Sequence, residues 1–420
     1  MKSCTYIQSA IYLAPNEIRA CCQRFFDGKE IKGDVLLLKP HGDVLYPEIE
    51  AAKENLIKSI NNGTDDRCNG CPHLKDFEWK SINQEYIKNI SIEDHSLCNM
   101  KCEYCSDTYY GGLKPSYNIS KIIESADGNF HKNLHIAWGG GEPTIRNDFE
   151  QVFDYISSTT NPATQRVFTN ALKYSKVLQK YIDERKCFIT TSIDAGTEDT
   201  FLEVRGSKGL ERVFKNLERY SALNPDLITI KYIFTDKNFS SNELEKFCEL
   251  VQQFNLTNCD FLISTDFKTS KPNKEIVSGL IELYFLLIEI GAHCVTFDDH
   301  VSSRVRDIQQ LFPKKIEDYL QSANVNKLEV MIWGTGTFAD FLINSSSNIK
   351  NKVITVAGVI DEDELMIGKK FHSYEIFNPD ILNNTESYLV IGSSNFYGEI
   401  YRKVISMGFD KSKILPSFLL

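Results

Sequence analysis

The sequence contains no apolar run long enough to span a membrane. Its first residues are interrupted by Gln8, Pro15 and Glu17, so they lack the continuous apolar centre of a signal peptide. There is also no run of Lys and Arg interleaved with aromatic residues, and the formal net charge of -10 disfavours a chain-wide nucleic-acid contact. We therefore expect a cytoplasmic protein with neither a membrane nor a nucleic acid as partner.

The chain of 420 residues is long enough for two or three domains with ordinary cores, because 42% of its residues are hydrophobic and 25% are charged. It contains 12 cysteines. In a reducing compartment, cysteines that cluster in the sequence indicate metal ligation rather than disulfide bonds. The cysteine clusters are therefore the first candidates for metal sites.

A Cys-x-x-x-Cys-x-x-Cys run, formed by Cys98, Cys102 and Cys105, follows the apolar stretch 87–92. Three thiolates on a four-iron cluster leave one iron without a protein ligand, free to bind a small molecule. The alternative is a zinc site, which would need a fourth Cys or His close by, and residues 106–116 supply none. The spacing favours a 4Fe-4S cluster with one open iron.

Two motifs together resemble the radical S-adenosylmethionine (SAM) enzymes, namely residues 98–105, CNMKCEYC, and residues 138–143, WGGGEP. They are similar to the three-cysteine loop and the Gly-Gly-Glu turn of that family, and they follow the first and second predicted barrel strands, as in the family. The resemblance covers about the middle half of the chain. It implies an enzyme that holds a 4Fe-4S cluster and SAM.

The resemblance also implies roles for individual residues. The three loop cysteines would ligate the cluster, and Tyr104 would lie near the adenine of SAM. Glycines allow close backbone approach and a carboxylate pairs with an ammonium. The residues that would face the methionine amino group of SAM are Gly140, Gly141 and Glu142.

Polar residues at later strand ends have further implied roles. Ser192 and Asp194 would hydrogen-bond ribose hydroxyls, and Arg205 would hold the methionine carboxylate. Thr169 and Asn170 match the Thr-Asn pair that ends the third strand in the family. A turn-capping or solvated role is the alternative for each of these residues. No residue is assigned as catalytic.

The core of the chain alternates β-rich runs with helical stretches, which predicts a parallel sheet with right-handed crossovers. The predicted strands are 87–92, 134–138, 166–169, 188–193, 227–234 and 259–264. The predicted helices are 149–157, 174–184, 209–223 and 242–254. We therefore expect an α/β fold with a partial (β/α)6 TIM-like barrel over residues 86–320. Chemistry in such barrels lies at the carboxyl ends of the strands, where the cysteine loop and Glu142 fall.

A further apolar run, residues 293–297, ends in Asp298, Asp299 and His300. If the run is a strand, these side chains could orient a substrate or move a proton at the barrel mouth. We interpret them instead as a solvated loop.

The N-terminal region, residues 1–85, contains a second group of cysteines: Cys21, Cys22, Cys68 and Cys71, with Cys4 apart from them. A Cys-x-x-Cys pair beside another pair can close a metal site. The region resembles auxiliary-cluster modules of the SPASM and twitch type, although those usually follow the core. We expect an auxiliary Fe-S cluster here, with zinc or burial of one thiol of the adjacent pair as alternatives. The remaining cysteines, which we expect in the core, are Cys187, Cys248, Cys259 and Cys294.

Residues 325–420 read as a Rossmann-like domain. An apolar strand, 328–333, runs into a Gly-x-Gly-x-x-Ala turn from Gly334 to Ala339, and a second strand ends at Asp361. Residues 388–391 are a later predicted strand, and the turn that follows it contains Gly392, Ser393 and Ser394. The domain resembles small modules attached to enzymes of sugar and polysaccharide modification. Because many of those serve in docking, we do not expect bound NAD(P).

The function implied by the resemblance is reductive cleavage of SAM and abstraction of hydrogen from a substrate C-H bond. We expect a carbohydrate, nucleotide sugar or polyol as substrate, with a peptide as the alternative, and an external one-electron reductant such as flavodoxin or ferredoxin. Two other classes are an NAD-dependent sugar enzyme and a zinc-stabilised nucleotide-binding scaffold. Neither explains the cysteine loop, Glu142 and Arg205 together.

Overall fold

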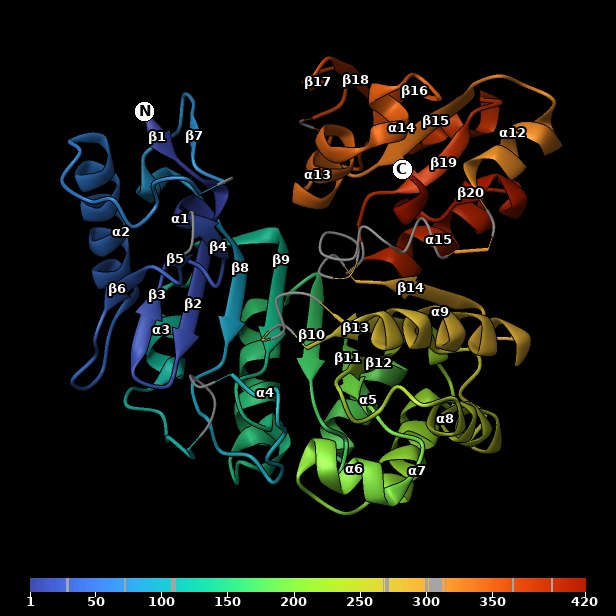
Figure 1. The fold of residues 1–420 in the computed structure, drawn as a ribbon. Helices are drawn as coiled ribbons and strands as arrows, with labels where there is room; N and C mark the ends of the chain where they lie inside the picture. The colour runs from blue at the N-terminus through green and yellow to red at the C-terminus, as the bar shows by residue number, and fades with distance from the viewer. Residues whose placement is uncertain are drawn as a thin grey trace. The chain divides into compact units, whose positions relative to one another are not determined.

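The computed structural model describes residues 1–27, 30–71, 73–106, 111–266, 268, 272–298, 301, 312–313, 315–364, 366–393 and 396–420 (Figure 1). The chain forms two compact units. The first contains residues 1–192 and 205–228, and the second contains residues 193–204 and 229–420. Three residues named above lie outside the described residues: Asp299, His300 and Ser394.

The first unit is built on one sheet, with strand order β6-β3-β2-β8-β9-β10-β11. In this order, all neighbouring strands from β2 to β11 are parallel. The pairs β2-β3 and β3-β6 are antiparallel. Their bounds are β2 (Ala10–Ala14), β3 (Glu17–Arg19), β6 (Leu36–Leu38), β8 (Ile87–Ile92), β9 (Phe130–Trp138), β10 (Thr164–Phe168) and β11 (Phe188–Ser192). Two short antiparallel pairs are β1 (Lys2–Ser3) with β7 (Lys75–Asp76) and β4 (Arg24–Asp27) with β5 (Glu30–Gly33).

The N-terminal strands are a feature that the sequence analysis did not predict. All five residues of β2 are buried, and β2 pairs in parallel with β8, the strand that leads to the cysteine loop. A strand covered on both faces reads as a continuous apolar run, and AIYLA is such a run. The N-terminal region therefore shares a sheet with the first barrel strand.

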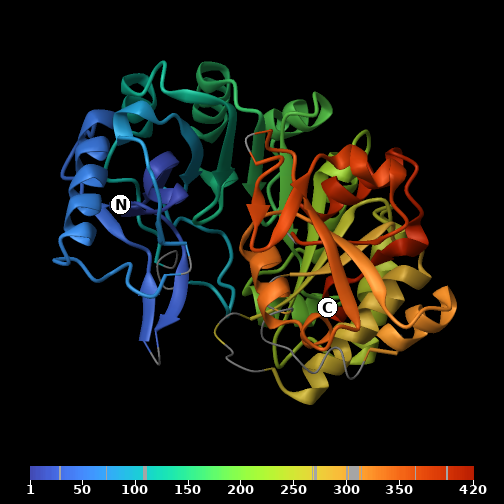
Figure 2. The same ribbon diagram turned by 90° about the horizontal axis from the view of Figure 1, so that it is seen from above.

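Amphipathic helices cover this sheet. Trp138 at the end of β9 packs against Phe153, with ring centroids 4.9 Å apart, and Phe153 lies on the buried face of α4. Helix α2 packs along β1 and β6, as Figures 1 and 2 show. The helices of the first unit are α1 (Thr5–Ser9), α2 (Tyr46–Asn61), α3 (Ile119–Ser125), α4 (Phe149–Thr160), α5 (Lys176–Asp183) and α7 (Leu210–Ser221). Helix α6 (Glu198–Arg205) belongs to the second unit except for its last residue.

The second unit continues the alternation of strands and helices. Strands β12, β13 and β14 are parallel neighbours. The bounds are β12 (Ile228–Phe234), α8 (Ser241–Gln253), β13 (Asp260–Thr265), α9 (Lys274–Glu289) and β14 (Cys294–Phe297). The six predicted strands thus correspond to β8 to β13, and the run after residue 293 is also a strand.

The C-terminal region of the second unit has its own sheet, with strand order β17-β18-β16-β15-β19-β20. All neighbours from β18 to β20 are parallel, and β15 is the first of them in the chain, so the order is that of a doubly wound sheet. The strands are β15 (Leu328–Trp333), β16 (Ile354–Ile360), β17 (Lys370–Phe371), β18 (Tyr374–Phe377), β19 (Tyr388–Ile391) and β20 (Ile414–Leu415). The helices are α12 (Ile316–Ala323), α13 (Thr337–Ser345), α14 (Ser347–Lys350) and α15 (Tyr397–Ser406).

The fold class is the predicted one: α/β, with the parallel strands of a partial TIM-like barrel and a separate C-terminal sheet. The predicted glycine turn follows β15, and Thr335 in this turn donates a hydrogen bond from its hydroxyl to Asp361 Oδ2 at 2.6 Å. Among the described helices, none combines the length and the apolar composition that a membrane span requires.

Candidate functional site

The cysteine loop follows β8 directly. The Cys98 side chain is exposed, and those of Cys102 and Cys105 are half-buried. The backbone amide of Cys105 donates to the carbonyl of Cys102 at 3.1 Å, which closes a tight turn between these two cysteines. The Met100 amide donates to Cys98 Sγ at 3.4 Å. The loop therefore presents three accessible thiols on one short segment.

The Gly-Gly-Glu turn packs directly against this loop. The amide of Gly141 donates to the carbonyl of His95 at 2.9 Å, and the amide of Glu142 donates to the carbonyl of Leu97 at 2.7 Å. A Cβ atom on Gly141 would stand 2.0 Å from the Leu97 carbonyl oxygen, so no larger residue fits there. Close approach to the cysteine loop thus explains the glycine, a reason that the sequence analysis did not identify.

Glu142 is 1% exposed, and its carboxylate joins two strand ends. Its Oε1 accepts hydrogen bonds from the hydroxyls of Thr144 and Thr169, both at 2.7 Å, and from the Thr144 amide at 3.1 Å. Its Oε2 accepts from the Asn170 amide at 2.6 Å. Burial raises the pKa of the Glu142 carboxyl, and these hydrogen bonds oppose the rise. The carboxylate therefore connects the turn after β9 to the residues after β10.

Asn170 connects the same strand end to the cysteine loop. Its side-chain Nδ2 donates to Asn99 Oδ1 at 2.6 Å and lies 3.9 Å from Cys98 Sγ. Its Oδ1 accepts from the Leu172 amide at 3.0 Å, which fixes the orientation of the amide group. An N-H donor beside a sulfur favours the thiolate form that a metal requires.

Arg205 and Gly206 contact the loop from another segment of the first unit. The Lys101 amide donates to the Arg205 carbonyl at 3.0 Å. Gly206 has a φ of +64°, and a Cβ atom there would lie 2.6 Å from the Lys101 carbonyl oxygen. The Arg205 guanidinium carbon lies 5.5 Å from the centre of the Tyr104 ring, and Arg205 is buried. Tyr104 and Arg205, predicted to contact opposite ends of SAM, are therefore adjacent.

The two predicted ribose ligands are placed differently. Ser192 is the last residue of β11 and is half-buried in the first unit. Asp194 belongs to the second unit, where it is fully buried and its Oδ1 accepts a hydrogen bond from the Ile233 amide at 2.7 Å. This contact gives Asp194 a role in holding β12, and ribose binding by either residue stays a prediction.

The solvated-loop interpretation of Asp298 is wrong. Its side chain is buried, accepts a hydrogen bond from the Ser264 hydroxyl, and pairs with Lys231 Nζ at 3.1 Å. These residues come from three neighbouring strands or their ends, β12 to β14. An acidic residue at the end of a strand can form hydrogen bonds and ion pairs with residues of adjacent strands. The position of Asp298 in the sequence therefore could not show that its side chain is buried.

The N-terminal cysteines gather at one pocket in the first unit. Cys4, Cys21, Cys68 and Cys71 line it, whereas Cys22 is exposed and is not among the lining residues. The predicted ligand set included Cys22 and left out Cys4, because spacing along the chain separates Cys4 from the other cysteines. The four cysteines that we predicted in the core are all buried: Cys187, Cys248, Cys259 and Cys294.

Within the described residues, no three His, Cys, Asp or Glu side chains are already arranged around a metal position, and this holds for the cysteine loop as well as for the N-terminal pocket. Some thiols instead accept backbone hydrogen bonds, as Cys98 and Cys4 do. A cysteine reorients by rotation about one bond, so the backbone placement is the relevant test. The three-thiol loop, with an amide donor beside Cys98, fits a cluster with one open iron.

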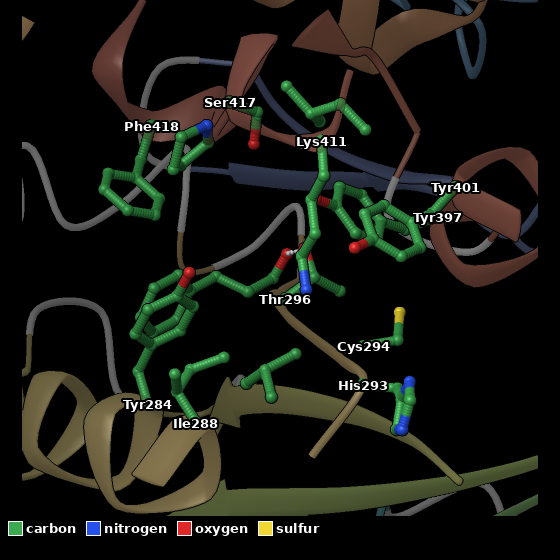
Figure 3. Close-up of a pocket in the computed structure, with 14 residues that line it drawn as sticks. Tyr284, Ile288, His293, Cys294, Thr296, Tyr397, Tyr401, Lys411, Ser417 and Phe418 are labelled. Atoms are coloured by element: carbon green, nitrogen blue, oxygen red, sulfur yellow. Dashed lines mark hydrogen bonds between the residues drawn. The ribbon is translucent and has the colours of Figure 1, made fainter. Parts of the chain in front are cut away.

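A separate cavity of about 120 Å³ lies in the second unit beside β14 (Figure 3). Its labelled lining residues include Tyr284, His293 and Cys294 on one side and Tyr397 and Lys411 on the other. The cavity is flanked by C-terminal residues that pack on the barrel strand. It therefore belongs to the attachment of the C-terminal region rather than to the strand ends.

Comparisons with known proteins match two parts of the chain. Residues 92–251 match the family model described as the Radical SAM superfamily, and residues 326–415 match the model described as C2185-like, N-terminal. GTP 3',8-cyclase of Vibrio atlanticus (strain LGP32) is 24% identical over 189 residues, covering 43% of this chain and 55% of the cyclase. GTP 3',8-cyclase of Shewanella denitrificans is 27% identical over 167 residues, covering 39% and 48%. The chain thus spans about half the length of the curated relatives that it matches.

Two solved structures are also similar. Native anSMEcpe with bound AdoMet and Cp18Cys peptide is 14% identical, covers 55% of this chain and 68% of that chain, and has a TM-score of 0.40. Streptococcus suis SuiB bound to precursor peptide SuiA is 15% identical, covers 66% and 61%, and has a TM-score of 0.37. The matched segment 92–251 contains both the cysteine loop and the Gly-Gly-Glu turn. Residues 92–251 are therefore a radical SAM domain.

Proposed function

We propose that this protein is an enzyme that cleaves SAM reductively and abstracts hydrogen from a C-H bond of its substrate. A 4Fe-4S cluster held by Cys98, Cys102 and Cys105 would supply one electron to SAM, which yields methionine and a 5'-deoxyadenosyl radical as the hydrogen acceptor. An external one-electron donor such as flavodoxin or ferredoxin would reduce the protein in the cytoplasm.

The protein residues have binding and positioning roles in this proposal. Arg205 binds the methionine carboxylate of SAM, and the adjacent Tyr104 lies against the adenine. The backbone of the Gly-Gly-Glu turn faces the methionine ammonium, while the Glu142 carboxylate holds the turn in place. Ser192 and Asp194 are retained as proposed ribose contacts.

The observation that carries this proposal is the convergence of three segments on the cysteine loop. The Gly-Gly-Glu turn binds residues 95–97, Asn170 binds Asn99, and Arg205 binds Lys101 through its carbonyl. A zinc-binding loop would not require a buried carboxylate and an arginine to be assembled beside a three-thiol segment. A SAM site does, because SAM has an ammonium and a carboxylate at its methionine end and an adenine at the other end, and each of these groups needs a partner near the open iron.

For the substrate, we propose a carbohydrate, nucleotide-linked sugar or polyol. The curated relatives that this chain matches are named for GTP, which supports a substrate with a ribose and phosphates within this class. A hydroxylated carbon also allows oxidation, epimerisation or dehydration after hydrogen abstraction. Peptide modification is the alternative.

The experiment uses candidate sugars, nucleotide sugars and polyols labelled with deuterium at carbon. Each is incubated anaerobically with the protein, SAM and a strong reductant, and 5'-deoxyadenosine is analysed by mass spectrometry. Deuterium in 5'-deoxyadenosine identifies the class of the substrate and the carbon attacked. Transfer from a small peptide alone would exclude the carbohydrate assignment, and no transfer from either class in a protein that still cleaves SAM would exclude both substrate classes.

A further inference from the structure

The N-terminal pocket gathers four thiols from three segments of the first unit. Cys4 precedes α1, Cys21 follows β3, and Cys68 and Cys71 lie in the segment after α2. Cys4 and Cys68 are buried among apolar residues of one hydrophobic cluster, and Cys21 and Cys71 are half-buried. Chain segments that meet only through the fold have therefore brought together as many thiols as a tetrahedral metal site needs.

We propose that Cys4, Cys21, Cys68 and Cys71 ligate a second metal centre through four thiolate sulfurs. The ligand chemistry is that of an iron-sulfur cluster or of tetrahedral zinc, both of which take four cysteines. The site includes Cys4 and omits Cys22, which differs from the set that spacing in the sequence indicated. The inference goes beyond the proposed function and does not depend on SAM cleavage.

The backbone geometry supports this ligand set. The Cys71 amide donates to the Cys68 carbonyl at 3.1 Å, so the Cys-x-x-Cys segment forms the tight turn that lets two thiols reach one metal. Cys4 Sγ accepts a hydrogen bond from the Ile7 amide at 3.5 Å at the start of α1. Such a backbone donor stabilises a thiolate and is typical of sulfur ligands to metals.

A buried cation supplies a second, independent observation. Lys53 on α2 is fully buried, and its Nζ has no hydrogen-bond partner among the described residues. It lies within electrostatic range of Cys4 and of Glu50 on its own helix. An isolated ammonium in a protein interior is costly, whereas four thiolates on a metal centre carry a net negative charge that would compensate it.

Complete ligation by four cysteines also decides what the centre can do. With no open coordination position, it cannot bind a substrate through the metal as the three-cysteine loop can. An iron-sulfur cluster at this site would transfer electrons, and a zinc ion would brace the N-terminal strands. Both outcomes require the same four thiolates.

The test measures the metal bound at the N-terminal pocket in a protein that lacks the three cysteines of the loop. The full chain with Cys98, Cys102 and Cys105 all changed to Ala is purified anaerobically, and iron, acid-labile sulfide and zinc are measured per chain. We expect this protein to retain either iron with matching sulfide or zinc. Adding Cys4→Ser or Cys71→Ser should remove most of that metal, whereas adding Cys22→Ser, the matched control, should leave it unchanged. The same variants in the otherwise wild-type chain report SAM cleavage separately.

Retention of the metal after Cys4→Ser and Cys71→Ser, its loss after Cys22→Ser, or no metal in the triple variant would overturn the proposal. Lys53→Met provides a variant in which all four thiols remain. We expect it to bind the metal several-fold more weakly while the metal-free protein unfolds at an equal or higher denaturant concentration. Equal metal affinity in Lys53→Met would overturn the charge-compensation role of Lys53.

Discussion

The Glu142 carboxylate accepts a hydrogen bond from the backbone amide of Asn170 at 2.6 Å, which fixes the third strand end to the Gly-Gly-Glu turn. The same Asn170 contacts Asn99 and Cys98 of the cysteine loop. A buried acid is therefore connected to the cysteine loop through one intermediate residue. The role of Glu142 that the structure shows is structural, and its contact with SAM is a proposal.

Replacement of Glu142 should destabilise the protein before any cofactor binds. Glu142→Ala leaves four buried donors without their acceptor, so we expect a loss of about 3 kcal/mol in the free energy of unfolding. Glu142→Gln keeps one acceptor oxygen and should lose about half as much. Urea unfolding of the metal-free protein measures both, and equal stability of all three proteins would contradict the assignment.

The amide of Asn170 should tune the cluster electronically. Hydrogen bonds to sulfur raise the reduction potential of an iron-sulfur cluster, so Asn170→Ala should shift the potential to a more negative value. Asn170→Asp adds a negative charge at the same place and should shift it further in the same direction. Redox titration followed by EPR gives the potentials. An unchanged potential in Asn170→Asp would show that residue 170 lies too far from the cluster to act on it.

His95, next to the Gly141 amide, should make stability depend on pH. Burial lowers the pKa of His95 below its ordinary value of 6.5, while Asp94 opposes the shift and Arg146 adds to it; Asp148 also opposes it. The unfolded chain then binds more protons than the folded one below pH 6.5, so the free energy of unfolding falls as the pH drops from there through the folded pKa.

His95→Gln should reduce this loss of stability, because glutamine does not titrate. Denaturant unfolding between pH 5 and 8 compares it with the wild type and with His41→Gln, a control at an exposed position. Parallel curves for wild type and His95→Gln would show that His95 is not the group responsible.

The C-terminal end should stabilise the second unit through Phe418. Its ring lies 5.3 Å from that of Phe297 at the end of β14 and 4.6 Å from that of Phe312. Phe418→Ala should cost about 3 kcal/mol, as large-to-small core substitutions do. Phe396→Ala, at a position 44% exposed, should cost less than about 1 kcal/mol. Thermal unfolding compares the two, and equal losses would contradict the packing role.

Much of the fold was predictable because its signals are local. The run 87–92 is a strand with the predicted bounds, and its cysteine loop is recognisable from spacing alone. Strand β2 was missed because five apolar residues do not distinguish a buried strand from another core segment. Its pairing with β8 is a long-range contact that leaves no periodic signal.

The pocket and the strand-end contacts illustrate the same limit. Cys4 joins the N-terminal pocket through the fold of three segments, so its distance along the chain from Cys68 was misleading. Asp298 is buried because Ser264 and Lys231 come from neighbouring strands. Sequence patterns show which chemistry is available, whereas partners that come from distant segments emerge only with the tertiary structure.

We propose above that the loop cysteines hold a cluster through which this protein cleaves SAM. The most direct measurement is 5'-deoxyadenosine formed by anaerobically reconstituted protein with SAM and a strong reductant, compared with Cys102→Ala whose fold is verified by circular dichroism and unfolding. We predict steady formation by the wild type and none above background by Cys102→Ala, since no nearby residue can replace the half-buried thiolate. Formation by Cys102→Ala at the wild-type rate, or no formation by a wild-type protein loaded with iron and sulfide, would contradict the account.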